Sequence, residues 1–175
     1  LGEQQFQELQ AALAHLLRNA LDHGVETIAE RRAAGKPGTA HIALTAERDG
    51  AGLRITVRDD GRGIDRPRIL ARAIERGLLT PEAAERADTA AIERLIFTPG
   101  FSSRDHSAAY SGRGMGMQVV RHTVALFAGR VTLASEPGRF TATTLHLGGD
   151  RLAGPLPSPA LTARQAAAAD GRDRD

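Results

Sequence analysis

The chain has 175 residues, of which 41% are hydrophobic and 25% are charged, and its formal net charge is +2. This composition is typical of one globular domain with its own core. Cysteine is absent, which excludes disulfides and thiolate metal sites and is compatible with a reducing cytoplasm, where we expect the protein to work.

The small net charge and an aromatic content of 3% argue against a nucleic-acid surface. No apolar run approaches the length needed to span a membrane, so we expect no membrane insertion. Because the chain begins with Leu1 rather than Met, we expect it to be a piece of a longer protein.

The first segment, 3–34, is predicted to be one long helix. Its apolar side is formed by Leu9, Leu13, Leu16, Leu17, Ala20 and Ile28. Its polar side carries His15, Asn19, Asp22 and Glu26, flanked by Arg18 and His23. A polar side is usually just solvated, but Asn and Asp are mediocre helix formers and their presence needs a reason. Their oxygens are hard ligands, suited to Mg²⁺ held jointly with phosphates.

Two strands follow, at 40–47 and 53–59, with a hairpin signal at Asp49-Gly50 between them. The second strand alternates strictly, so its last residue, Asp59, shares the buried face of Leu53 and Val57. A buried carboxylate needs a donor. The glycines that follow would let a flat group pack against the backbone, although an ordinary turn that starts with Asp is the alternative.

Helices are predicted at 67–77 and at 88–97. Between them a short helix is predicted to begin after Thr80 as its N-cap, with Pro81 at the first helical position. The polar and irregular stretch 98–107 is predicted to be a lid over bound phosphates. Phe97 and Phe101 would anchor the base of this lid, and packing in the core is the alternative for both rings.

A glycine-rich loop, Ser111-Gly112-Arg113-Gly114-Met115-Gly116, runs into an apolar helix predicted at 115–128. Unpaired N–H groups and the positive end of the helix dipole would converge on this loop, which indicates an anion site, most often for phosphate. A simple tight turn is the alternative, because short glycine motifs have many false matches.

Gly129 is expected to end that helix. The last two strands, 131–135 and 141–147, are joined by a turn at 136–138, and alternation places the Thr141 hydroxyl on the buried face. Residues 1–149 are therefore predicted to form one domain and 150–175 a flexible tail or linker. The fold class predicted is an α/β two-layer sandwich, a mixed β-sheet covered on one face by helices.

Four motifs occur in a fixed order, His15–Gly24, Asp59–Asp65, Leu95–Ser102 and Ser111–Met117. Together they resemble the ATP-binding domain of CheA-type chemotaxis histidine kinases. That domain belongs to the GHKL, or Bergerat-fold, superfamily of gyrase, chaperone, histidine kinase and mismatch-repair ATPases. The resemblance covers about 15–147 and implies that ATP and Mg²⁺ bind between the sheet and the helices.

The resemblance also implies roles for single residues on the first helix. Asn19 is similar to the Mg²⁺ ligand of the family, and His15 and Arg18 are similar to residues close to the γ-phosphate. Asp22 and His23 would line the same wall of the site.

The base and phosphate sites follow from the same resemblance. Asp59 is similar to the carboxylate that accepts a hydrogen bond from the adenine amino group, supported by Thr141. Gly61 and Gly63 are similar to the glycines against which the base packs. The phosphates would be cradled by Gly112, Gly114 and Gly116 together with the neighbouring Ser111, Arg113 and Met115.

The implied activity is transfer of the ATP γ-phosphate to a histidine on a separate phosphotransfer domain, in two-component chemotaxis signalling. A response regulator is the expected next partner, and chemoreceptor or adaptor proteins are further candidates. Two residues depart from the family pattern. Gln118 stands where Asp is usual, and Phe140 stands where a small glycine is usual, so that its ring could displace Thr141 or fill part of the base pocket.

Three other functions stay open at this point. A gyrase-like or chaperone-like ATPase is disfavoured because those relatives carry a glutamate where this chain has His15. A regulatory domain that binds nucleotide without kinase activity is compatible with Phe140. A serine kinase of the anti-sigma-factor type would share the same pocket.

Overall fold

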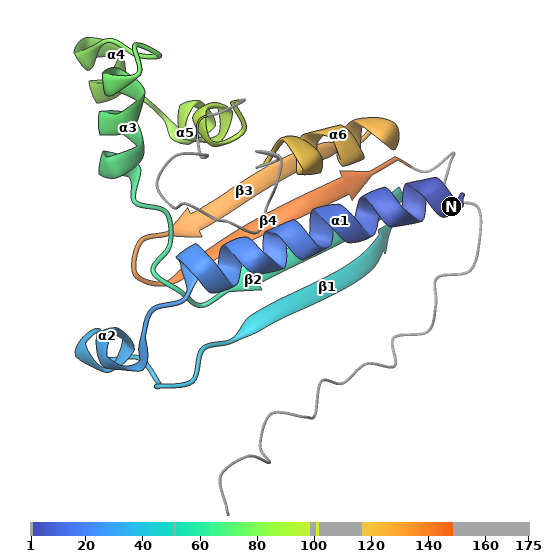
Figure 1. Cartoon of the computed structure of the whole chain (residues 1–175), viewed down its shortest axis with the longest axis horizontal. Helices are drawn as coiled ribbons and strands as arrows, with labels where there is room; N and C mark the ends of the chain where they lie inside the picture. Colours follow the sequence, from blue (N-terminus) through green and yellow to red (C-terminus); the bar gives the residue numbers. More distant parts are fainter. Residues whose placement is uncertain (1, 51, 99–100, 102–116, 149–175) are drawn as a thin grey trace, which may run out of the picture.

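The computed structural model describes residues 2–50, 52–98, 101 and 117–148 of the chain. In chain order the elements are α1 (Glu3–Asn19), the π-helical turn η1 (Ala20–Gly24), α2 (Ile28–Ala33), β1 (Ile42–Asp49), β2 (Gly52–Asp59), α3 (Arg66–Glu75), α4 (Pro81–Glu85), α5 (Thr89–Ile96), α6 (Gln118–Leu126), β3 (Arg130–Glu136) and β4 (Phe140–Leu147). The strands form one sheet, and α1 and α6 lie side by side over one of its faces (Figure 1). The predicted two-layer α/β sandwich is therefore confirmed.

The sheet has four strands in the order β1-β2-β4-β3, and all three pairings are antiparallel. The expectation of a mixed sheet was wrong for the part of the chain that the structure describes. Short turns account for two of the pairings, because strands joined by a tight hairpin can pair only antiparallel, and both β1–β2 and β3–β4 are such hairpins. The third pairing, of β2 with β4, is antiparallel as well. The central pairing of β2 with β4 places Asp59 opposite Thr141.

The single long helix predicted for 3–34 is also wrong. The helix widens into the π-helical turn η1 and stops at Gly24, and Val25 adopts extended backbone with φ −75° and ψ 133°. The next helix starts from Thr27, whose side chain and that of Glu30 cap each other's backbone N–H groups. This capping box was legible in the sequence as Thr-x-x-Glu. The break leaves Ile28 off the apolar side, with 59% of its surface exposed.

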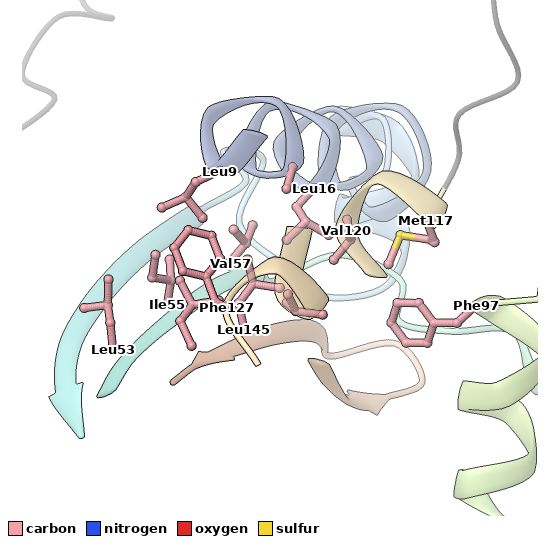
Figure 2. Close-up of a cluster of buried hydrophobic side chains, with 13 residues drawn as sticks. Leu9, Leu16, Leu53, Ile55, Val57, Phe97, Met117, Val120, Phe127 and Leu145 are labelled. Carbon is pink, nitrogen blue, oxygen red and sulfur yellow. The ribbon is translucent and has the colours of Figure 1, made fainter. Parts of the chain in front are cut away.

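The main core lies between the two layers (Figure 2). It receives buried side chains from α1, from α6 with the residues at its ends, from α5's end and from the inner faces of β2 and β4. Its members are Leu9, Ala12, Leu16, Leu53, Ile55, Val57, Phe97, Met117, Val120, Val124, Phe127, Leu145 and Leu147. The alternation predicted for β2 is confirmed, since its inward residues Leu53, Ile55 and Val57 are each 5% exposed.

A second, smaller cluster joins α3 to α5. Ala73, Leu95 and Phe101 are buried in it, and no part of it belongs to the main core. The helices around it begin as the sequence predicted, because the Thr80 hydroxyl accepts from the N–H of Ala83 and the Asp88 carboxylate from that of Ala91. Within the described ranges, no helix combines the length and apolar character needed to cross a bilayer.

The end of α6 differs from the expectation in one residue. The left-handed position is Ala128, with φ 48°, rather than Gly129. The N–H of Gly129 bonds the Val124 carbonyl at 2.8 Å and that of Ala128 bonds Ala125 at 3.0 Å, which is a Schellman motif. Glycine is needed at 129 because a Cβ there would overlap the carbonyl oxygen of His146 in β4.

A matched pair of leucines tests where the core lies. Leu145 has no exposed surface and Leu78 is 44% exposed. Leu145→Ala is expected to lower the free energy of unfolding by about 2–5 kcal/mol, through lost burial and the cavity left behind. Leu78→Ala should change it by less than about 0.5 kcal/mol. Urea denaturation of both variants measures the difference, and equal losses would contradict this placement of the core.

Candidate functional site

Asp59 is the centre of the candidate site. It ends β2 on the inner face of the sheet and is 5% exposed, as strand alternation predicted. Its carboxylate accepts the backbone N–H of Gly61 at 3.0 Å and also a backbone hydrogen bond from Thr141, its partner across the strand pair. The buried acid therefore has the donors that it needs. The Thr141 side chain is only partly buried on the same face.

The end of the first helix closes over this carboxylate. A Cβ built at Gly24 would lie 3.0 Å from the carboxylate atoms of Asp59, and one at Gly61 would overlap the carbonyl oxygen of Gly24. That carbonyl accepts the N–H of Arg62 at 2.8 Å. Sequence reasoning did not assign Gly24 to the site, although a glycine at a helix end close to polar residues was the available signal.

The glycines predicted to face a base pack on the protein's own backbone. Gly61 packs on Gly24, and Gly63 has φ 71° and would place a Cβ 2.5 Å from the carbonyl oxygen of Glu136. The chain itself therefore requires glycine at both positions. The prediction that a base packs against them stays a prediction.

Burial raises the pKa of Asp59, and the hydrogen bonds from Gly61 and Thr141 lower it again in part. The negative charges of Asp60 and Glu26 add to the increase. The net effect is a carboxyl group whose pKa lies above its ordinary value, as expected for an acid held away from water.

Asn19, the last residue of α1, is tied to two other parts of the site. Its amide nitrogen lies 3.1 Å from Nε2 of His15 and 3.3 Å from the sulfur of Met117, which precedes α6. Both hydrogen bonds use Nδ2, so the carboxamide oxygen is engaged by neither. Asn19 is connected to Gly24, and so to Asp59, by the single turn η1.

His15 lies one helical turn before Asn19 and is partly buried. Burial lowers the pKa of His15, and the nearby charges of Arg18 and His23 lower it further. A neutral imidazole can accept at Nε2, which fits the position of the Asn19 amide. Arg18, Asp22 and His23 are exposed at the same end of α1 and η1.

Phe140 does not fill the inner side of the sheet. Its ring lies under the guanidinium of Arg58, whose Cζ is 3.8 Å from the ring centroid. Arg58 and Phe140 each precede an inward residue, Asp59 and Thr141, so both point to the opposite face. The Phe140 ring does not displace Thr141, since Thr141 keeps its pairing with Asp59.

Phe97 and Phe101 follow the alternative reading, core packing. Phe97 is 7% exposed in the main core and Phe101 is 4% exposed in the second cluster. Apart from Thr98 and Phe101, the predicted lid lies outside the described residues, as do the predicted phosphate-loop residues Ser111, Gly112, Arg113, Gly114, Met115 and Gly116.

A hollow lies beside a row of cross-strand partners that begins at Asp59. Across the sheet this row runs from Asp59 to Thr141 and on to Ser135 of β3. The hollow is lined by Ser135, by Ile64, whose N–H bonds the Ser135 hydroxyl at 2.8 Å, and by residues of α5 and β3 that include Glu93. It lies at the β3 end of the row.

No group of three or more His, Cys, Asp or Glu side chains that could hold a metal alone occurs in the described part of the chain. The donor chemistry of Asn19 is instead that of a single oxygen ligand. Mg²⁺ is commonly bound by one or two protein oxygens together with substrate phosphates. The described residues therefore fit a magnesium ion that a nucleotide would share.

Comparison with known proteins agrees with these features. Residues 5–150 match the model of the family described as histidine kinase-, DNA gyrase B- and HSP90-like ATPases. The chain is 46% identical over 140 residues to the chemotaxis protein CheA of Halobacterium salinarum, covering 80% of this chain and 21% of that one. It is 45% identical over 141 residues to the gliding motility regulatory protein of Myxococcus xanthus, covering 80% and 18%. With CheA of Bacillus subtilis the identity is 39% over 140 residues, covering 80% and 21%. The chain thus spans about a fifth of the length of these relatives.

The raised pKa of Asp59 gives a prediction for stability. A raised pKa means that the folded state binds the proton more tightly than the unfolded chain, so the ionised form costs stability above the ordinary pKa. Asp59→Asn is therefore expected to keep or raise the melting temperature at pH 7. This advantage should shrink as the pH falls through the folded pKa and the wild-type acid becomes protonated. Thermal melts of both proteins at pH 7 and pH 4 test this, and a variant that is less stable only at pH 7 would contradict it.

The lowered pKa of His15 gives a second prediction. An NMR titration of the ring protons should give a pKa below the ordinary value of 6.5. Arg18→Gln should raise this pKa only partly, since burial is the larger cause. A value above 6.5 in the wild type would contradict the neutral acceptor described above.

Proposed function

Because the chain belongs to the family of histidine kinase-, DNA gyrase B- and HSP90-like ATPases, we propose that it is the ATP-binding catalytic domain of a CheA-like histidine kinase. It transfers the γ-phosphate of ATP to a histidine on a separate phosphotransfer domain. The observation that carries the proposal is the inward Asp59 carboxylate, closed over by Gly24 and joined by one turn to Asn19.

Asp59 recognises the adenine in this proposal. An ionised carboxylate only accepts hydrogen bonds, and the 6-amino group of adenine is a donor. Two backbone N–H groups already fix the orientation of the carboxylate. A site built around such an acceptor rejects a base that lacks the donor, because the buried acid would be left with an unmet hydrogen bond.

The end of the site at Asn19 is proposed to bind the phosphates. Phosphoryl transfer depends on positioning and on neutralising charge, with little covalent work for the protein. The carboxamide oxygen of Asn19 is the proposed ligand for Mg²⁺, which when bound neutralises phosphate charge. Arg18 and Arg113 are the candidates to offset the charge that develops on the transferred group. The acceptor is itself a nucleophilic imidazole, so the site needs no strong base.

His15 argues against the hydrolytic alternative. Gyrase-like and chaperone-like relatives carry a glutamate at this position to activate water, whereas this imidazole faces the Asn19 amide and has a lowered pKa. The regulatory alternative loses its main support, since Phe140 lies on the far face of the sheet. The proposed partners are the phosphoacceptor domain and a response regulator, with chemoreceptor or adaptor proteins as further candidates, all outside this chain.

Two substitutions and one control test the proposal. Asp59→Asn should raise the dissociation constant for Mg·ATP at least tenfold while the protein stays folded, because the acceptor for the amino group is lost. Asn19→Ala should lower phosphotransfer at least about a hundredfold through lost placement of the metal and phosphates. Arg139→Gln, on the exposed β3–β4 turn, should change neither. Calorimetric titration and transfer of labelled phosphate to candidate phosphotransfer domains measure these effects.

The product identifies the function. Phosphohistidine is labile in acid, so acid-labile label on the acceptor is the expected result. Acid-stable label would indicate a serine kinase, free phosphate without an acceptor would indicate an ATPase, and the lack of saturable ATP binding would indicate a regulator.

A further inference from the structure

We propose that Arg31 is a positioning residue for the nucleotide site and that it acts through Asp60 to orient the Asp59 carboxylate. The inference rests on the function proposed above. Arg31 belongs to a set of four charged residues, Arg31, Glu26, Lys36 and Asp60, called here the Arg31 cluster. None of the four except Glu26 was singled out in the sequence, and Glu26 was assigned to a different face.

Arg31 is held from several sides and is 1% exposed. Its guanidinium forms a two-pronged ion pair with Asp60, with Nη2 to Oδ2 at 2.8 Å and Nη1 to Oδ1 at 3.1 Å. Nε donates to the carbonyl of Pro37 at 2.7 Å and Nη2 to that of Thr39 at 3.2 Å. One side chain on α2 thus connects the segment before β1 to the turn after β2. Such paired contacts fix direction as well as distance.

Lys36 and Glu26 complete the cluster. Nζ of Lys36 lies 2.7 Å from Oε1 of Glu26, and Oε2 of the same carboxylate lies 3.2 Å from Nη1 of Arg31. Lys36 also donates to the carbonyl oxygens of Asp60 at 2.9 Å and Gly61 at 2.7 Å. The backbone that directly follows Asp59 is therefore held by two cations.

One peptide group transmits this hold to the site. The carbonyl of Asp60 and the N–H of Gly61 belong to the same planar peptide, so fixing one end fixes the other. Arg31 and Lys36 donate to that carbonyl, at 3.3 Å and 2.9 Å. The N–H at the other end donates to Oδ1 of Asp59 at 3.0 Å. The cluster thereby sets the donor that orients the carboxylate.

The charges of the cluster also affect the protonation of Asp59. Burial alone would raise the pKa of Asp60 and of Glu26, but both pKa values lie below their ordinary values. Arg31 and His41 lower that of Asp60, and Lys36, with the charge of Arg31, lowers that of Glu26. Both negative charges raise the pKa of the neighbouring Asp59. Removing Arg31 would leave these charges uncompensated and would favour protonation of Asp59. A protonated Asp59 would be a poorer acceptor for the adenine amino group.

Exposed pairs in the same region offer a matched control. Arg62 and Glu30 also join the turn after β2 to α2, but they lie 3.5 Å apart with side chains 50% and 52% exposed. Such a pair contributes little. Arg62→Gln therefore removes a nearby cation without touching the peptide that bonds Asp59.

The test compares ATP with inosine triphosphate, which carries a carbonyl where adenine has its amino group. Dissociation constants with Mg²⁺ are measured for the wild type, Arg31→Met, Arg31→Lys and Arg62→Gln. The wild type should prefer ATP. Arg31→Met should weaken ATP binding about tenfold and leave inosine triphosphate nearly unchanged. Arg31→Lys should lie between, because lysine keeps the charge but not the two-pronged geometry. Arg62→Gln should match the wild type.

A general loss of structure would weaken both nucleotides alike, so the ratio of the two constants is the decisive value. Circular dichroism checks the fold, and Lys36→Met, which removes one of the two donors to the Asp60 carbonyl, replaces Arg31→Met if that variant does not fold. A folded variant with the wild-type ratio, or with equal losses for both nucleotides, would overturn the role of Arg31. If the wild type bound ATP no better than inosine triphosphate, that result would instead overturn the proposed recognition of the adenine amino group by Asp59.

Discussion

The candidate site is organised around one carboxylate, which is kept inside the protein at the end of a strand. Asp59 lies where β2 leaves the sheet, and an acid in that position is costly unless backbone donors and close packing surround it. Gly61 and Thr141 supply the donors, and Gly24 supplies the packing. A fold built only for stability would place an apolar residue there, so the buried acid is a candidate functional residue.

The break in the first helix follows from the same requirement. A continuous helix would carry its polar side past the strand end, whereas the π-helical turn η1 and the extended Val25 bring Gly24 down onto Asp59. π-Helical turns are often found at functional sites. The break also releases Glu26 and places it against Arg31 and Lys36, under the turn that follows β2. Local irregularity, buried charge and the site are thus parts of one arrangement.

Periodicity predicted the parts of this fold that depend on burial. The inward direction of Asp59 was predictable because a strand alternates strictly, and the helix start after Thr80 was predictable from its cap and the following Pro81. The break at Gly24 was not predicted, because helical spacing continued across it and the Thr27–Glu30 capping box, a local signal for a new helix start, was not used. The outward position of Phe140 follows from the same alternation, because Phe140 precedes the inward Thr141, but its contact with the Arg58 guanidinium required the structure. The Arg31 cluster joins residues up to 34 positions apart, which no local pattern connects.

The central claim is that Asp59 reads the adenine amino group while Asn19 holds the metal at the phosphates. A crystal structure of the chain with Mg²⁺ and a non-hydrolysable ATP analogue tests it most directly. The account predicts the 6-amino nitrogen about 3 Å from the Asp59 carboxylate and the metal on the Asn19 oxygen. An analogue bound elsewhere, with Asp59 contacting only its own backbone donors, would contradict the account.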